Sequence, residues 1–324
     1  MIENKQKHLS FIIPHKGRFE MLIETIESIA LQKSPTFSVD VIVVSQTPEI
    51  QTCTLTENQD LPLSVFIRPP EETISSLRNF GVTQTKGEFL AFLDADIYLS
   101  ANWAEQMLKE LSSQDDRIIV SAQQICAEDA PPLEKIRTFL SNVEIDKNVA
   151  FLPGRNLFMT RDAFHQIGGF PEQLVTCEDY YFTDKAAKLG KLFYTSSATY
   201  RHIGEDKAYK AMFDKEIWRG QSNIQSLSGR DVPLRELPSF FVPPAILILI
   251  ITALVLLIVG ITKLAMLALA LALLPVIVYS LRLLNIAKSE VSFAKIVLFY
   301  AVYFPARAIG TLVGVFKTIK VKQS

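Results

Sequence analysis

The chain has 324 residues and contains little cysteine, little glycine and no excess of basic residues. Its three cysteines, Cys53, Cys126 and Cys177, are odd in number and widely spaced, which excludes a disulfide framework and a cysteine-based zinc site. We therefore expect reduced thiols in a cytosolic environment. The formal net charge is −1, and without a basic patch the chain is not expected to bind nucleic acid.

Acidic residues are almost missing from the last quarter of the chain. Residues 1–239 carry 25 basic and 33 acidic side chains, whereas residues 240–324 carry 8 and 1. Hydrophobic residues make up 49% of the whole chain, a large share for a protein that lies entirely in water. We predict a cytosolic domain over residues 1–235 and a membrane region over residues 236–324.

Three long apolar stretches lie in this membrane region. The first two, about 240–262 and 264–284, are each long enough to cross ~30 Å of hydrocarbon, and only Lys263 separates their uncharged runs. They predict a transmembrane helical hairpin. The stretch 291–316 is interrupted by a proline and by Arg307, and a charged residue near the middle of a membrane is costly. This stretch either spans the membrane or is interfacial or re-entrant, and the cost of the charge favours the second alternative, with a cytosolic C-terminus.

Apolar strands alternate with amphipathic helices in the first domain. The runs Leu9–Pro14, Val39–Val44 and Leu63–Ile67 are short and rich in β-branched side chains, which is typical of buried parallel strands. Helical periodicity follows the first run, and it also precedes the run Glu88–Leu93. This alternation predicts an α/β fold with a mostly parallel central sheet flanked by helices.

Two pairs of acidic residues lie at the ends of predicted strands or helices. Asp94 and Asp96 come directly after the apolar run 88–93, at the strand end where open α/β sheets bind ligands. Their carboxylates suit Mg²⁺ or Mn²⁺ bridging a diphosphate, although a solvated turn would contain the same residues. Glu178 and Asp179 open a predicted helix, where they either complement the helix dipole or supply a general base.

Other polar residues accompany these pairs. Arg78 and Arg219 are able to bind a diphosphate bidentately. Alternatively, Arg78 is a surface arginine on a helix, and Arg219 belongs to an aromatic-capped approach to the membrane. His202 follows a late strand, and would contact phosphate or metal or have a structural role. Arg155 and Asn156 follow a Pro-Gly turn and would hydrogen-bond a sugar or the second acidic pair, or be ordinary loop residues.

Taken together, residues 8–230 resemble a family 2 glycosyltransferase with the GT-A fold. The resemblance rests on six stretches in the family's order: FIIPHKGR, VDVIVV, LRNFGVTQTKGEFLAFLDAD, FLPGRNLFMTRDAFHQIGGFPE, CEDYYFTDKAAKLG and WRGQ. It implies a nucleotide-diphospho-sugar donor, a divalent ion (Mn²⁺ or Mg²⁺), and transfer of the sugar with inversion.

The resemblance also implies roles for the candidate residues. Asp96 is similar to the metal ligand of the family, with Asp94 and His202 as further metal contacts. Asp179 is similar to the catalytic base, with Glu178 beside it. The residues implied at the donor are Asp94, Arg78, Arg219, Pro14 and Ser45, and those implied at the sugar or acceptor are Arg155, Asn156 and Trp218.

One departure concerns the residues after the second strand. The family usually has an acid there that contacts the nucleotide base, followed by a Gly-Ser turn, whereas this chain has Ser45, Gln46 and Thr47. We expect a UDP-sugar donor, with GDP- and TDP-sugars left open.

These features predict a membrane-anchored inverting glycosyltransferase that transfers a sugar to a hydroxyl of a lipid-linked or cell-surface glycan. The expected partners are the nucleotide sugar, the glycan or lipid-linked acceptor and the lipid bilayer. The apolar run near the N-terminus is too short for a signal peptide, so we expect the plasma (inner) membrane with the catalytic domain facing the cytoplasm. A polyprenyl-phosphate glycosyl synthase and a catalytically degenerate membrane scaffold remain alternatives.

Overall fold

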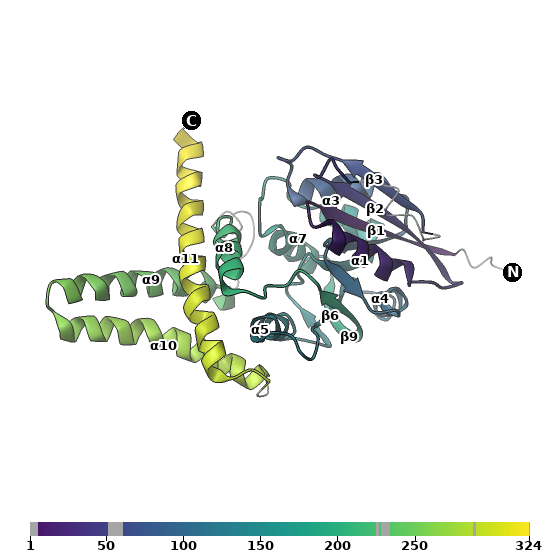
Figure 1. Cartoon of the computed structure of the whole chain (residues 1–324). Helices are drawn as coiled ribbons and strands as arrows, with labels where there is room; N and C mark the ends of the chain where they lie inside the picture. Colours follow the sequence, from purple (N-terminus) through teal and green to yellow (C-terminus); the bar gives the residue numbers. More distant parts are fainter. Residues whose placement is uncertain (1–5, 51–60, 225–226, 228–233, 288–289, 324) are drawn as a thin grey trace. The chain divides into compact units, whose positions relative to one another are not determined.

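The chain packs into two compact units in a computed structural model (Figure 1). The first comprises Met1–Ile125 and Glu144–Gly204, and the second comprises Cys126–Val143 and Glu205–Ser324. The predicted boundary at residue 235 separates cytosol from membrane, which is a different division, and it stays a prediction. The structure describes residues 6–50, 61–224, 227, 234–287 and 290–323.

A mixed sheet is the centre of the first unit. Its strands are β1 (Lys7–His15), β2 (Phe37–Ser45), β3 (Leu63–Ile67), β4 (Phe89–Leu93), β5 (Ile97–Leu99), β6 (Arg117–Ile125), β7 (Lys147–Val149), β8 (Asn156–Thr160) and β9 (Lys191–His202). Their order is β3-β2-β1-β4-β8-β6-β9-β5, with β7 paired to β9. The neighbours from β3 to β4 are parallel, whereas β8 is antiparallel to both β4 and β6. The predicted α/β fold with a mostly parallel sheet is confirmed.

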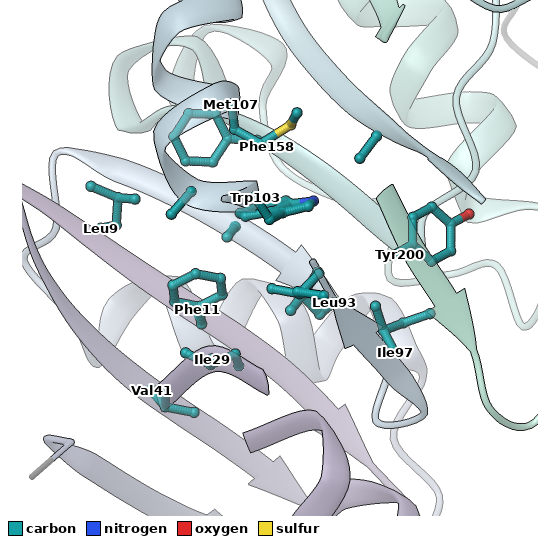
Figure 2. Packing of buried hydrophobic residues seen from close by; sticks show 14 of the residues in the cluster. Leu9, Phe11, Ile29, Val41, Leu93, Ile97, Trp103, Met107, Phe158 and Tyr200 are labelled. Atoms are coloured by element: carbon teal, nitrogen blue, oxygen red, sulfur yellow. The ribbon is translucent and has the colours of Figure 1, made fainter. Parts of the chain in front are cut away.

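Helices cover both faces of this sheet. They are α1 (Phe19–Ala30), α3 (Ile74–Thr83), α4 (Trp103–Leu111), α6 (Arg161–Ile167) and α7 (Glu178–Ala187). Successive side chains of a strand point to opposite faces, so Phe11 of β1 packs with α1 and α4, while Ile12 packs with α3, α6 and α7. Figure 2 shows the first of these two cores, where the ring centroids of Phe11 and Trp103 are 5.7 Å apart.

The second unit is helical in its described residues. Its helices are α5 (Pro132–Ser141), α8 (Tyr209–Gly220), a short 3₁₀ turn (Leu234–Glu236), α9 (Leu237–Ile258), α10 (Thr262–Ala287) and α11 (Phe293–Gln323). Three of them, α9, α10 and residues 293–316 of α11, are long and apolar enough to cross a membrane. The third apolar stretch therefore forms one helix that continues through Pro305.

Some short elements escaped the sequence patterns. Helix α5 was not predicted from the sequence, and neither were β5 and β7, which have three residues each. Of the three cysteines, Cys126 and Cys177 form no disulfide within the part of the chain that the structure describes, and Cys53 lies outside that part.

Candidate active site

Three of the residues expected at the donor lie at one edge of the sheet. Pro14 is near the end of β1. His15 and Ser45, the last residues of β1 and β2, pair in register. Asp94 directly follows β4. Because β1, β2 and β4 are parallel, their carboxyl ends share this edge, where open α/β sheets bind ligands.

Arg78 of α3 is almost wholly buried, with 1% of its surface exposed. Its terminal nitrogens donate to Glu178 Oε1 at 2.9 Å, to Asp94 Oδ1 at 2.8 Å and to the Gly154 carbonyl oxygen at 3.2 Å. Burial alone would lower the pKa of Arg78, but three neighbouring carboxylates outweigh it and raise that pKa. Arg78 therefore stays charged and joins the end of β4 to the start of α7.

The adjacent acids Glu178 and Asp179 occupy the first turn of α7 in different surroundings. Burial, and then the charge of Asp179, raises the pKa of Glu178 to about 7, against the opposing effect of Arg78. Burial also raises the pKa of Asp179, whose oxygens accept from the N–H groups of Gly154 at 3.2 Å and Tyr180 at 2.9 Å. Glu178 is buried against Arg78, whereas Asp179 is partly exposed. Asp179 is thus the better placed of the two to meet a substrate.

A second carboxylate group is centred on Asp96, between β4 and β5. Its Oδ1 lies 3.3 Å from His202 Nε2, and its Oδ2 lies 3.1 Å from Arg18 Nη1. The pairing of Ile97 with His202 between β5 and β9 creates this proximity. Gly204 approaches so closely that a Cβ there would overlap Asp96 Oδ2. Two of the predicted metal ligands are therefore neighbours in space.

Asp96 and His202 offer one carboxylate and one imidazole, which ions such as Mn²⁺ accept. Within the described residues, no three His, Cys, Asp or Glu side chains form a metal-binding group. Asp94, the third predicted contact, is paired with Arg78. Two protein ligands leave positions for diphosphate oxygens and water, as in Mg²⁺ sites that bind phosphates, so the pair fits an ion that arrives with a phosphate-bearing ligand.

Arg155 and Asn156, at the start of β8, are held by neighbouring strands. Arg155 donates to the Tyr200 hydroxyl at 2.8 Å and to Gln124 Oε1 at 2.9 Å. Asn156 is fully buried, and its Oδ1 accepts from the Ala122 N–H at 3.2 Å. These contacts order the start of β8, and the contacts with sugar expected for both residues stay predictions.

Ser45 belongs to a local hydrogen-bond group where an acid is usual. Its Oγ lies 2.9 Å from His15 Nδ1 and accepts from the Thr47 N–H at 3.0 Å. Burial lowers the pKa of His15, so its imidazole is neutral at pH 7. The end of β2 therefore presents uncharged groups.

Arg219 and Trp218 lie on α8, in the second unit. Arg219 Nη1 donates to Glu216 Oε1 at 2.6 Å, and Trp218 is half exposed. The structure does not place the two units relative to one another, so the expected roles of these residues at the donor and acceptor stay predictions.

Three residues of the site were not singled out from the sequence. Arg18 forms an ion pair with Asp96. It precedes α1 and has a left-handed backbone conformation, with φ 50°. A Cβ on Gly154 would lie 3.1 Å from Arg78 Nη1, and Gly204 packs on Asp96. The available signals were the glycine loop after the first strand, which contains Arg18, and the position of Gly204 two residues after the predicted metal ligand.

Replacing Arg78 by Met should destabilise the first unit by about 3–5 kcal/mol, because it leaves the buried carboxylate of Glu178 and the partly buried one of Asp94 without their cation. Arg68→Met is the matched control, since Arg68 pairs with Glu72 at the surface, 35% exposed, and such a pair contributes about 1 kcal/mol or less. Urea unfolding of the solubilised protein measures both. Equal losses in the two variants would contradict the central role of Arg78.

The stability of the folded state should fall as the pH rises from 4.5 to 7, because Glu178 has an ordinary pKa of 4.5 and a folded-state pKa of about 7. Below pH 4.5 the protonated form of Glu178 makes its full contribution to the free energy of unfolding, which is ~1.4 kcal/mol per unit of difference between the two pKa values. This contribution is lost as the pH rises to about 7. The free energy of unfolding is measured against pH for the wild type and for Glu178→Gln. Between pH 4.5 and 7 the wild-type curve should fall more steeply than that of the variant, and outside this range the two slopes should be equal. Parallel curves throughout would refute the raised pKa.

Known proteins are similar in sequence to this chain. Residues 10–168 match the family model described as glycosyl transferase family 2. Glycosyltransferase AglE of Haloferax volcanii is 24% identical over 231 residues, which are 67% of this chain and 73% of that protein. An uncharacterized glycosyltransferase of Rickettsia bellii is 29% identical over 174 residues, which are 53% of this chain and 25% of that longer protein.

A solved structure shares the fold. The mannosyltransferase PcManGT from Pyrobaculum calidifontis, in complex with GDP-Man and Mn²⁺, is 16% identical, with a TM-score of 0.60 over 95% of this chain and 88% of that one. The fold expected from the six sequence stretches is thus confirmed, and residues 10–168 belong to glycosyl transferase family 2.

Proposed function

We propose that this protein is an inverting, membrane-anchored glycosyltransferase that moves a sugar from a nucleotide-diphospho-sugar to a hydroxyl of a glycan or lipid-linked acceptor. Family membership supports sugar transfer. The observation that carries the mechanism is the contact of Arg78 with both Asp94 and Glu178, because it joins the expected donor side to the acidic turn of α7.

Asp179 acts as the general base in this proposal. A carboxylate with a raised pKa accepts a proton more readily near neutral pH, and two backbone N–H groups fix its orientation. As the acceptor hydroxyl attacks the anomeric carbon opposite the diphosphate, the new C–O bond forms and the bond to the diphosphate breaks. The hydroxyl proton passes to Asp179, and the single displacement inverts the anomeric centre. Glu178 and Arg78 position this turn.

Asp96 and His202 would hold a divalent ion, Mn²⁺ or Mg²⁺, which when bound neutralises charge on the leaving diphosphate. The Mn²⁺ and GDP-Man in the similar Pyrobaculum structure support a metal and a nucleotide sugar. Arg18 adds positive charge beside Asp96. UDP-, GDP- and TDP-sugars all remain donors to test, because the groups at Ser45 are uncharged.

The hairpin of α9 and α10 would anchor the enzyme. Their outward side chains are apolar, including Ile248, Leu254 and Leu273, each more than half exposed. We place them in the plasma (inner) membrane, with the first unit facing the cytoplasm, where a nucleotide-sugar donor is available to it.

Release of nucleotide from UDP-, GDP- and TDP-sugars by the solubilised protein, with Mn²⁺ or Mg²⁺, tests the function. We expect slow hydrolysis of one donor, and its loss on chelation of the ion or in Asp96→Ala, since that variant removes a metal ligand. Asp116→Ala is a control, because Asp116 is an exposed partner of Lys191. If the protein binds none of these donors, the enzyme hypothesis is wrong and a catalytically degenerate membrane scaffold is favoured.

Asp179→Asn should lower turnover by about 10²–10⁴-fold, the usual contribution of a general base, with donor affinity unchanged. Asp184→Asn on the same helix is the control, since Asp184 pairs with Lys188 at the surface. Steady-state kinetics and donor titration measure both effects. A mild loss in Asp179→Asn would instead indicate a phosphate acceptor, as in a polyprenyl-phosphate glycosyl synthase, which needs little base assistance.

A further inference from the structure

Helix α11 differs from α9 and α10 in its surroundings within the second unit. Of its apolar segment 44% is buried in protein, against 17% in α9 and 28% in α10. Figure 1 shows α9 and α10 side by side and α11 running across them. The three helices therefore do not form a uniform bundle, although each is apolar enough to cross a membrane.

Helix α11 meets α8 almost backbone to backbone. A Cβ on Gly310 would overlap the carbonyl oxygen of Ile217 and lie 3.0 Å from Gly220 Cα, and a Cβ on Gly314 would overlap the carbonyl oxygen of Gln221. The two glycines are four residues apart and so lie on the same face of α11. Only side chains as small as glycine permit this approach, so α8 fixes the position of this part of α11.

Polar contacts reinforce the same junction. Arg307 Nη1 lies 3.5 Å from Glu216 Oε2 on α8, and Asn223 donates to the Thr311 hydroxyl at 3.3 Å. Glu216 is 1% exposed. The arginine that interrupts the apolar stretch thus has its counter-ion on α8.

Helix α8 itself belongs in water. Its outer face carries Lys210 and Asp214, which pair at 2.8 Å with 88% and 60% of their side chains exposed. Charged side chains are expensive in hydrocarbon. Any part of α11 that contacts α8 must therefore also lie at or near the aqueous boundary.

Connectivity places both ends of this contact on one side of the membrane. Residues 221–236 contain no apolar run able to cross, so α8 and the start of α9 are on the same side. The hairpin of α9 and α10 returns the chain to that side, where α11 begins at Phe293. Contact with α8 keeps residues 307–314 there as well.

The opposite face of α11 is apolar. Leu298, Leu312 and Phe316 are 43%, 45% and 66% exposed. Leu312 and Phe316 follow Leu298 by 14 and 18 residues, which is close to a whole number of turns in a helix with 3.6 residues per turn. The three side chains therefore lie on one side of α11, away from the glycines. Such a face suits the boundary between lipid headgroups and acyl chains.

We propose that α11 is not a third span but lies along the membrane surface, held by α8, with its apolar face in the lipid. The C-terminus then stays on the same side as α8. This inference rests on the proposed anchoring by α9 and α10, and goes beyond it by assigning α11 to the lipid surface.

Labelling of single cysteines with a membrane-impermeant maleimide tests this assignment in sealed vesicles of one orientation. In a full-length background with Cys53, Cys126 and Cys177 replaced by serine and turnover retained, one cysteine is placed at Lys210 on α8, at Lys263 between α9 and α10, or appended after residue 324. We expect the Lys210 and appended cysteines to label from one side and the Lys263 cysteine only from the other.

Each other outcome has a definite meaning. If the appended cysteine labels together with the Lys263 cysteine, α11 crosses the membrane and the inference is wrong. If all three label from one side, the hairpin does not span, and the proposed anchoring fails instead.

A second variant separates the α8 contact from the charge of Arg307. In Arg307→Leu the appended cysteine should still label from the α8 side, with less than a twofold change, because the glycine contacts and the charges of α8 remain. Movement of that cysteine to the Lys263 side would show that the arginine alone kept α11 out of the membrane, and would overturn the role given to α8.

Discussion

Arg78 links three parts of the first unit that are far apart in the sequence. Its guanidinium is planar and donates in two directions at once, so one side chain holds Asp94 after β4, Glu178 on α7 and the backbone of Gly154. A lysine has a single charged nitrogen and could not reproduce this geometry. Since Asp179 follows Glu178, the position of the proposed base depends on a residue that it does not itself bind.

The same arrangement separates the properties of two neighbouring acids. Both have a raised pKa because burial disfavours their charged forms. Glu178 is committed to Arg78, whereas Asp179 is oriented by backbone N–H groups and remains partly exposed. The different roles proposed for them rest on these partners and exposures, because adjacency in the sequence does not distinguish the two acids.

The second unit contains a buried carboxylate among arginines, the reverse of the Arg78 site. Glu216 contacts Arg137 of α5 at 3.1 Å, Arg219 at 2.6 Å and Arg307 of α11 at 3.5 Å. It thereby ties α5, α8 and α11 together. Charged groups with low exposure need such partners, which explains how an apolar helix tolerates an arginine in its middle.

Sequence patterns were enough to predict the long strands β1 to β4, the apolar helices α9 and α10, and the resemblance to glycosyl transferase family 2. Long apolar runs and regular periodicity dominate local structure, so β3 was predicted with its observed bounds, Leu63–Ile67. Three-residue strands such as β5 carry no such signal. The pairing of Arg78 with Asp94 and Glu178, the packing of Arg18 and Gly204 on Asp96, and the contact of Arg307 with Glu216 became visible only in the folded chain. These contacts depend on register and packing between segments tens of residues apart, which no local pattern encodes.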